Sequence, residues 1–332
     1  MIMAGGQGER FWPLTHKNYP KYLIRLNGEK SLLQKTYERL SKVYKKQPIY
    51  VVTTQDHVQF VSRELPMLRK AQVLVEPFRN NTAPALFFSA AVLAEKYGLR
   101  EVISFFPADH LIERQDLFHE TVTRALRAAE VGKLTTIGIQ PKFPATGYGY
   151  IETGRRLPVG RAVYEALRFK EKPRKAAALA YLRRKNFLWN SGIFAWRADV
   201  FFEKMKRFCP EIHNRFDLRH LKASYRKLPR ISIDYALMEK VDQVAVVKTR
   251  MDWCDMGNWD MFFDKAKKDR KGNYVEGFVT GRGNRDSLLI NHTEQPLAAA
   301  GLQGFIAVKT RQGALLAERS GAEEAALLMK KG

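Results

Sequence analysis

A chain of 332 residues is long enough to bury one large core together with a small appendage. Its formal charge of +23 attracts anions of every kind, from nucleotides and sugar phosphates to nucleic acids and membrane surfaces. Its basic residues form scattered helical groups without interleaved aromatic residues, and no apolar run approaches the ~18 residues of a membrane span, so neither nucleic-acid binding nor membrane insertion is expected.

The chain opens with a glycine-rich loop, Ala4-Gly5-Gly6-Gln7-Gly8-Glu9-Arg10, directly after Met1-Ile2-Met3. Three residues are barely half of a buried strand, and an upstream start and a trimmed end both remain open. The loop matches neither common phosphate-binding fingerprint, because Phe11 stands where the dinucleotide motif needs glycine and no Gly-Lys-Ser/Thr follows. Backbone N–H groups at such a turn still suit triphosphate oxygens. A purely structural glycine turn is the alternative.

Short apolar runs then alternate with helical patterns. The predicted buried strands lie at 49–52, 73–75, 102–106 and 135–139, and the predicted helices at 32–43 (behind a cap at Ser31), 83–97 and 116–131. Strands without polar alternation that alternate with helices favour a doubly wound, mainly parallel α/β sheet of the Rossmann-like type. Ligands bind such sheets at the carboxyl ends of the strands, where the glycine loop and Asp109 fall.

From Gly147 onward the pattern is mixed, with strand-like runs at 148–152, 163–171 and 192–196. After Lys271, regularly placed glycines separate short strands at 288–290, 305–308 and 315–316, before a short terminal helix. The expected organisation is a large α/β domain at 1–262 and a small β-rich C-terminal unit at 272–332. That unit either mediates dimerisation or covers a sheet edge.

Cys209 and Cys254 lie far apart and in no metal-ligand spacing, which predicts free thiols in a reducing cytoplasm. No signal peptide is visible, so the expected location is cytoplasmic.

Two carboxylates, Asp109 and Asp255, each follow a short β-type run. Oxygen ligands at strand ends suit Mg²⁺, and Arg10 and Lys21 lie near the glycine loop to neutralise phosphate charge. A phosphate-cradling loop, cations and two strand-end carboxylates together indicate metal-assisted transfer of a nucleotidyl group.

Collinear motifs resemble the sugar-nucleotide pyrophosphorylases, and within them the mannose-1-phosphate guanylyltransferase branch. They are Gly5 to Leu14, Pro20-Lys21-Tyr22-Leu23, Glu76-Pro77, Asn80 to Ala85, Pro107-Ala108-Asp109-His110, Thr146 to Ile151, Phe169 to Pro173, Trp189 to Gly192 and Ser232 to Lys240. The resemblance runs in order to about Trp259 and more weakly to the end. Tyr22, where this branch usually has glutamine, and Cys254, where serine or aspartate is common, depart from it. The bifunctional relatives carry a further cupin-like isomerase domain after this stretch, so isomerase activity is not expected.

The resemblance implies that GTP and mannose 1-phosphate give GDP-mannose and pyrophosphate, with Mg²⁺ held by Asp109 and Asp255. The implied catalytic residues are Arg10, Lys21, Asp109, Lys172 and Asp255. The implied nucleotide-binding residues are Ala4, Gly5, Gly6, Gly8, Glu9, Arg10, Lys21, Glu76, Asn81, Ala108 and Asp109. The implied sugar-phosphate site comprises Gly147, Glu171, Lys172 and Asn190.

Several residues keep a plainer alternative. Glu171-Lys172 reads equally as an exposed charged pair, and Asn190 as the cap of a turn before Ser191-Gly192. Glu76 matches the two adjacent donors of guanine, but it could also end a strand and point to solvent. Trp253 and Trp259 are expected to pack around Asp255, and His110 to support the site without binding metal. Asp234 is expected in the support of the sugar pocket, or as a residue that orients another pocket residue.

Three other functions compete with guanylyl transfer to mannose 1-phosphate. They are a pyrophosphorylase of the same fold with another base or hexose, a sugar-nucleotide-binding regulatory subunit without turnover, and a basic nucleic-acid-binding protein. Retention of Arg10, Lys21, Asp109, Lys172 and Asp255 argues against the regulatory subunit.

Overall fold

The computed structural model describes residues 1–6 and 8–329, so Gln7 of the glycine loop and residues 330–332 lie outside it. The chain forms two compact units, each with a hydrophobic core of its own. The first unit comprises residues 1–5, 37–108 and 112–253, and the second comprises residues 6–36, 109–111 and 254–332. Neither unit is one continuous stretch, and the expected boundaries at 1–262 and 272–332 stay a prediction.

The first unit is built on a nine-stranded sheet in the order β3-β2-β1-β4-β9-β6-β10-β8-β7. Its first four strands are parallel: β1 (Ile2–Ala4), β2 (Val51–Thr54), β3 (Val73–Glu76) and β4 (Val102–Pro107). These strands confirm the predicted parallel α/β pattern, although β2 begins two residues later than the sequence indicated. The helices of this half are α2 (Val58–Glu64), α3 (Thr82–Tyr97) and the part of α1 (Leu32–Val43) from residue 37 onward.

The second half of the sheet is mixed in direction. The long strand β9 (Phe187–Arg197) runs antiparallel between β4 and β6 (Thr135–Ile139), and β10 (Val244–Thr249) is parallel to β6. The strands β7 (Tyr150–Arg156) and β8 (Val163–Lys170) form an antiparallel pair beyond β10. The helical elements of this half are α4 (Gln115–Glu130), α5 (Lys175–Arg183), α6 (Ala198–Phe208), α7 (Pro210–Arg215), α8 (Leu221–Arg226) and a π-helical turn (Asp234–Met238). Outside the nine-stranded sheet, β5 (Leu111–Ile112) pairs with β11 (Trp253–Cys254).

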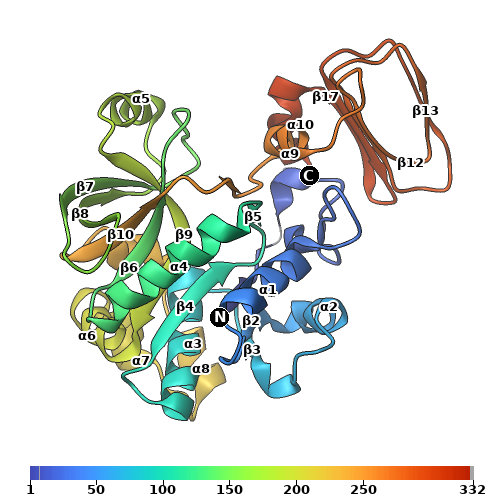
Figure 1. Cartoon of the computed structure of the whole chain (residues 1–332). Coiled ribbons are helices and arrows are strands. Elements are labelled where there is room, and N and C mark those ends of the chain that lie inside the picture. Colours follow the sequence, from blue (N-terminus) through green and yellow to red (C-terminus); the bar gives the residue numbers. More distant parts are fainter. Residues whose placement is uncertain (7, 330–332) are drawn as a thin grey trace. The chain divides into compact units, whose positions relative to one another are not determined.

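Consecutive residues of a strand point to opposite faces of the sheet. Where both are apolar, each face must be covered, and helices cover them here. In β4, Phe105 contacts Trp196 of β9, with ring centroids 5.5 Å apart, and Trp196 stacks on Phe201 of α6 at 4.8 Å. The next residue, Phe106, instead contacts Phe118 of α4 at 6.0 Å. Helices α3 and α7 pack beside α6, while α4 crosses β4, β6, β9 and β10 (Figure 1). Apolar side chains on both faces of β4 thus account for the layers.

The second unit is rich in short strands, as the glycine spacing predicted. Its elements are α9 (Trp259–Lys265), β12 (Tyr274–Gly277), β13 (Val279–Arg282), β14 (Leu288–Asn291), β15 (Leu297–Ala300), β16 (Phe305–Thr310), β17 (Gly313–Glu318) and α10 (Ala322–Leu328). Strands β12, β14 and β16 are parallel, β17 closes the sheet antiparallel, and β13 pairs with β15. One face of this sheet packs on a core that contains Phe11 of the N-terminal signature and Trp259.

The other face of that sheet carries a continuous apolar row. Val275, Leu289, Ala307 and Leu316 are cross-strand neighbours on β12, β14, β16 and β17. The two middle side chains are buried, whereas Val275 is 51% exposed and Leu316 is 65% exposed. The row therefore ends in apolar surface at both edges of the sheet.

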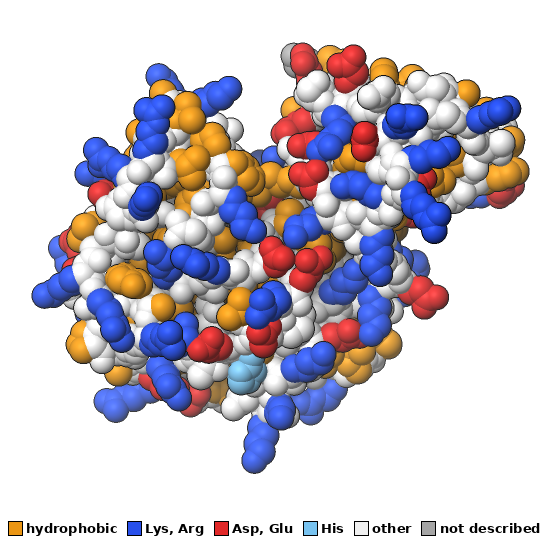
Figure 2. Space-filling model, turned by 45° about the horizontal axis from the view of Figure 1, so that its top comes forward, with side chains coloured by type: hydrophobic (Ala, Val, Ile, Leu, Met, Phe, Trp, Pro, Cys, Tyr) orange, Lys and Arg blue, Asp and Glu red, His pale blue; other side chains and the backbone are white. Residues whose placement is uncertain are grey.

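Lys and Arg side chains are spread over the visible face of the molecule and do not gather in one patch (Figure 2). This distribution agrees with the scattered helical groups in the sequence. Within the described residues, we find no helix that combines the length and the apolar character needed to cross a bilayer.

Candidate active site

In the second unit, Lys21 brings the two predicted metal ligands together. Its ammonium Nζ lies 2.7 Å from Oδ2 of Asp109 and donates to the main-chain oxygen of Asp255 at 2.5 Å. Burial alone would raise the pKa of Asp109, but Lys21 and His110 beside it hold the pKa below its ordinary value. A carboxylate from the end of β4 and a residue that follows β11 thus meet around one cation.

The backbone around Lys21 explains why apolar residues follow it and why position 8 is a glycine. Tyr22 and Leu23 are buried and anchor the short 3₁₀ turn that begins at Lys21. Gly8 has a φ of 74°, and a Cβ atom built on it would lie 2.3 Å from Cβ of Lys21. Thr15 also fixes this loop, since its hydroxyl donates to the Gly8 oxygen at 2.6 Å. Any side chain at position 8 would therefore displace the cation.

Arg10 contacts the C-terminal helix of the same unit. Its Nη1 lies 3.5 Å from Oε1 of Glu323 on α10, and both side chains are more than 40% exposed. Oε2 of Glu323 accepts a hydrogen bond from Asn258, which caps α9. Such an exposed ion pair contributes little stability and leaves Arg10 able to exchange partners.

In the first unit, Glu76 lies at the end of β3 and is only 7% exposed. Its Oε2 accepts a hydrogen bond from the hydroxyl of Tyr225 at 2.6 Å, while Oε1 faces Gly5, 3.7 Å from where a Cβ of that residue would lie. Burial raises the pKa of Glu76 to about 7, and the Tyr225 hydroxyl and the charge of Arg79 oppose part of that rise. The alternative in which Glu76 points to solvent is wrong.

A second cluster in the first unit contains the predicted sugar ligands. Asn190 of β9 donates through Nδ2 to Asp234 at 3.2 Å and accepts through Oδ1 from Thr136 at 3.0 Å. Glu171 is buried, and its Oε1 lies 2.8 Å from Nζ of Lys172, which is 60% exposed. Burial, and then the charge of Glu171, raise the pKa of Asp234 to about 7.

The structure also shows part of what the structural alternatives predicted, namely a turn cap at Asn190 and a charged pair of Glu171 and Lys172. Asn190 Oδ1 also accepts from the N–H of Gly192 at 3.2 Å, which is the turn contact that the sequence suggested. Glu171 and Lys172 do form a charged pair, although Glu171 is not exposed. Asp234 bonds to Asn190, in agreement with an orienting role.

The remaining predicted residues lie at the edges of these clusters. Ala4 and Ala108 are buried next to strand ends, and Gly6 and Glu9 are exposed. Asn81, with a φ of 70°, caps α3 by accepting from the N–H of Thr82 at 2.8 Å. Gly147 is exposed. Trp259 is buried against Phe11, as expected of a packing residue.

The sequence matches the nucleotidyl transferase family over residues 1–272. The chain belongs to the nucleotidyl transferase family.

Individual relatives refine this assignment. The chain is 34% identical over 339 residues to a mannose-1-phosphate guanylyltransferase of Klebsiella pneumoniae, a match that covers 98% of this chain and 71% of the relative. It is 35% identical to the xanthan biosynthesis protein XanB of Xanthomonas campestris over 98% of this chain and 71% of that one. A crystal structure described as mannose-1-phosphate geranyltransferase from Thermus thermophilus superposes with a TM-score of 0.87 at 32% identity, over 99% of this chain and 97% of that chain.

Two residues that shape these clusters gave little signal in the sequence. Tyr225 is a single tyrosine on a short polar helix, and only the fold brings it to Glu76, 149 positions away in the chain. Gly149 lies inside a recognised motif, but its reason is spatial: a Cβ there would be 2.6 Å from Oε2 of Glu171.

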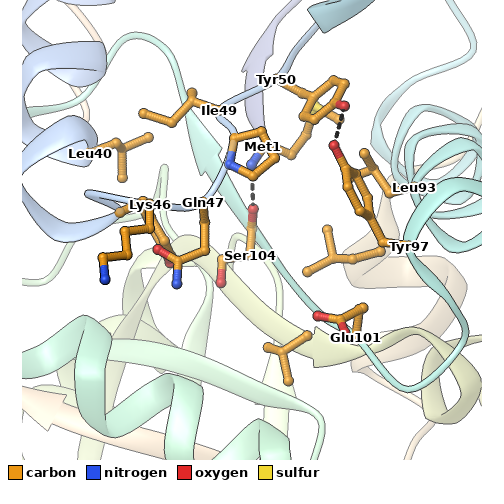
Figure 3. Close-up of a pocket in the computed structure, with 14 residues that line it drawn as sticks. Met1, Leu40, Lys46, Gln47, Ile49, Tyr50, Leu93, Tyr97, Glu101 and Ser104 are labelled. Carbon is orange, nitrogen blue, oxygen red and sulfur yellow. Dashed lines mark hydrogen bonds between the residues drawn. The ribbon is translucent and has the colours of Figure 1, made fainter.

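A cavity of about 320 Å³ lies at the amino-terminal ends of the parallel strands, away from Glu76 (Figure 3). Met1, Tyr50 and Ser104 line it, and the amino group of Met1 donates to the Ser104 oxygen at 2.8 Å. Tyr50 precedes β2, whereas Glu76 pairs with Thr54 at the end of that strand. Ligands of parallel α/β sheets bind at the carboxyl ends, so this cavity is not the expected site of a nucleotidyl transferase.

Proposed function

We propose that the protein is a mannose-1-phosphate guanylyltransferase, which transfers GMP from GTP to mannose 1-phosphate and releases pyrophosphate. The observation that carries the proposal is the cluster of Lys21, Asp109 and Asp255, in a chain similar over 98% of its length to enzymes of that name.

The chemistry needs positioning more than proton transfer. An oxygen of the sugar phosphate attacks the α-phosphorus of GTP, a new O–P bond forms, and the bond to the β-phosphate oxygen breaks to release pyrophosphate. The nucleophile is already mostly dianionic at neutral pH, because its second pKa is about 6. No general base is required, and the main obstacle is the repulsion between two polyanions.

The charged residues have separate tasks in this proposal. Arg10 and Lys21 neutralise the triphosphate, and the N–H groups around Gly5, Gly6 and Gly8 bind its oxygens. Lys172 binds the sugar phosphate. The Glu323 partner of Arg10 is exposed, so the arginine can leave it for a phosphate at little cost.

Asp109 and Asp255 are proposed to hold Mg²⁺. The fit rests on donor chemistry: two carboxylates supply hard oxygen ligands, and Mg²⁺ usually takes one or two carboxylates together with substrate phosphates and waters. The Lys21 ammonium, bound by the carboxylate of Asp109 and the main-chain oxygen of Asp255, also indicates that this position favours a cation. When bound, the metal would withdraw negative charge from the reacting phosphates. Lys21 would then turn toward the triphosphate.

Recognition of the two organic groups falls to the first unit. Glu171, Asn190 and the backbone of Gly147 are proposed to bind the sugar hydroxyls, with Asp234 fixing the amide of Asn190. Glu76 is proposed to accept hydrogen bonds from N1–H and the exocyclic amino group of guanine. Its burial at the end of β3 supports this role, because a buried carboxylate rejects a base that cannot satisfy it.

We also propose a cytoplasmic location and a homodimer formed through β12. The buried free thiols Cys209 and Cys254 agree with a reducing compartment. Strand β12 is the edge of its sheet and exposes Val275. A two-fold axis can pair such an edge strand with the same strand of a second copy and bury the two apolar side chains together.

A panel of substrates tests the function. Pyrophosphate release is measured for each of GTP, ATP, UTP, CTP and dTTP against mannose 1-phosphate and other hexose 1-phosphates with Mg²⁺. The expected result is turnover with GTP and mannose 1-phosphate well above every other pair. Turnover with another pair assigns a different pyrophosphorylase, and binding without turnover assigns a regulatory subunit.

Asp255→Asn tests the proposed metal ligand. Turnover is expected to fall by roughly 10² or more with an unchanged melting temperature, because one strong electrostatic contact is lost. Asp252→Asn is the matched control, since this nearby carboxylate pairs with Lys142 at 3.5 Å. Near-normal Mg²⁺-dependent activity in Asp255→Asn would remove Asp255 from the metal site.

A further inference from the structure

Tyr225 is fully buried, yet its hydroxyl meets a carboxylate and not a neutral acceptor. Its O–H donates to Oε2 of Glu76 at 2.6 Å, and its ring packs edge-on against Phe88 with centroids 6.2 Å apart. A short hydrogen bond to a carboxylate is among the strong ones in proteins, and here it selects one rotamer of Glu76. It also leaves the second oxygen, Oε1, toward Gly5 at the start of the glycine loop.

The main chain that carries Tyr225 is itself tied to the loop after β3. Asn80 donates through Nδ2 to the oxygen of Tyr225 at 2.8 Å, and Arg230 donates to the oxygen of Arg79 at 3.2 Å. Farther along, the N–H of Ile233 donates to the hydroxyl of Thr82 at 2.8 Å. The position of the tyrosine hydroxyl is therefore set by the loop that follows the strand of Glu76.

We propose that Tyr225 is a positioning residue for base selection: its hydroxyl holds Glu76 in the orientation that accepts both hydrogen-bond donors of guanine. This inference rests on the proposed reading of guanine by Glu76. Without the hydroxyl, the Glu76 carboxylate can rotate and accept from one donor of guanine in place of two, so discrimination between GTP and other nucleotides falls. The phosphate chemistry proposed for the other unit is unaffected.

The experiment compares GTP with ITP, which lacks only the exocyclic amino group. Tyr225→Phe removes the hydroxyl and keeps the ring against Phe88. The ratio of kcat/KM for GTP to that for ITP is expected to fall about tenfold, the effect of one charge-assisted hydrogen bond. Tyr50→Phe is the matched control, because it removes the hydroxyl of another buried tyrosine, which is hydrogen-bonded to Tyr97 at 2.6 Å. Tyr50 directly precedes β2, whereas Glu76 pairs with the last residue of that strand. Its ratio is expected to stay at the wild-type value.

The Glu76→Gln background separates positioning from a structural role. There, Tyr225→Phe is expected to change the ratio no further, because the hydroxyl acts through the carboxylate. Asn80→Ala gives a second variant, which keeps Tyr225 and loosens its main chain, and it is expected to lower the ratio in the same direction.

Two results overturn the inference in distinguishable ways. If Glu76→Gln lowers the ratio but Tyr225→Phe and Asn80→Ala leave it unchanged, or lower both rates equally, Tyr225 has no part in selection and the role of Glu76 survives. If Glu76→Gln itself leaves the ratio unchanged, the reading of guanine by Glu76 fails and the role of Tyr225 fails with it.

Discussion

Two largely buried carboxylates have pKa values raised close to neutrality, so each can change its charge within the neutral pH range. Glu76 and Asp234 are both held at about 7, in each case first by burial. The sequence identified Glu76 from its place in a motif, but burial and the Tyr225 contact depend on residues that are distant in the chain. Sequence reasoning could place the carboxylate and could not supply its environment.

The GTP preference should therefore depend on pH. Ionised Glu76 accepts two hydrogen bonds, whereas the protonated acid presents a donor to the donors of guanine. The charged and titratable groups around it are Tyr225 and Arg79, and Arg79 in turn contacts Asp56 and His57. Because the pKa is raised, the GTP-to-ITP ratio of kcat/KM is expected to rise as pH increases through about 7.

Measuring the ratio cancels titration of the phosphates, which the two nucleotides share. Tyr225→Phe should move the midpoint to higher pH, because the lost hydrogen bond favoured the ionised form. Glu76→Gln should give a flat profile, and a wild-type ratio that does not vary with pH would contradict the assignment.

Lys172 gives a second prediction at this scale. Lys172→Ala is expected to raise the KM for mannose 1-phosphate by roughly 10- to 100-fold and to leave the KM for GTP unchanged, because its proposed partner is the sugar phosphate alone. Lys170→Ala is the matched control: its ammonium lies 3.4 Å from Glu239 and has no proposed substrate contact. Equal effects on both substrates would mean that Lys172 acts through general charge or folding.

At the scale of elements, local signals placed helices well and strand direction poorly. The helix 32–43 forms as expected, and the N–H of Gln34 donates to the Ser31 hydroxyl at 3.2 Å in the predicted cap. The run at 192–196 is instead part of the longer β9, antiparallel to both neighbours. Apolar periodicity reports burial on two faces and carries no information on direction, which depends on the chain's route between strands.

Gly149 shows how tightly neighbouring elements pack around Glu171 and Asn190. Gly149→Ala would place Cβ 2.6 Å from Oε2 of Glu171 and 3.3 Å from Cβ of Asn190. We expect a loss of about 1–3 kcal/mol in the free energy of unfolding, typical of overpacking, and a larger KM for mannose 1-phosphate.

Denaturant unfolding and steady-state kinetics on Gly149→Ala test this. Gly147→Ala is the control, because its Cβ would meet nothing within 4 Å. If both variants behave alike, close packing at Gly149 has no functional consequence.

For the whole molecule, each compact unit is assembled from several segments of the chain. The N-terminal signature shares a core with the C-terminal strands, where Phe11 lies 5.1 Å from Trp259. Nothing in local periodicity pairs residues so distant in sequence. The same limit applies to the site: the sequence named Lys21, Asp109 and Asp255, but the contacts of Lys21 with both aspartates became evident only in three dimensions.

The proposed dimer is tested by mass in solution. We expect light scattering to give twice the 38.2 kDa of one chain, and Val275→Lys on the edge strand β12 to give the monomer. Leu316→Lys is the control, because Leu316 is also exposed, at the other edge, and its replacement should leave the dimer intact. A monomeric wild type would overturn the proposal.

The tie between the loop after β3 and residues 225–239 matters to anyone who wants to redirect this enzyme toward other nucleotide sugars. One short stretch carries Tyr225, which contacts Glu76, and, nine positions later, Asp234, which contacts Asn190. If the loop after β3 alone were replaced by that of another enzyme, the new loop would contact residues 225–239 of this chain, which do not match it. Productive chimeras should exchange residues 76–83 and 225–239 as one cassette, and libraries that diversify both segments together should yield more active variants than libraries that diversify either one.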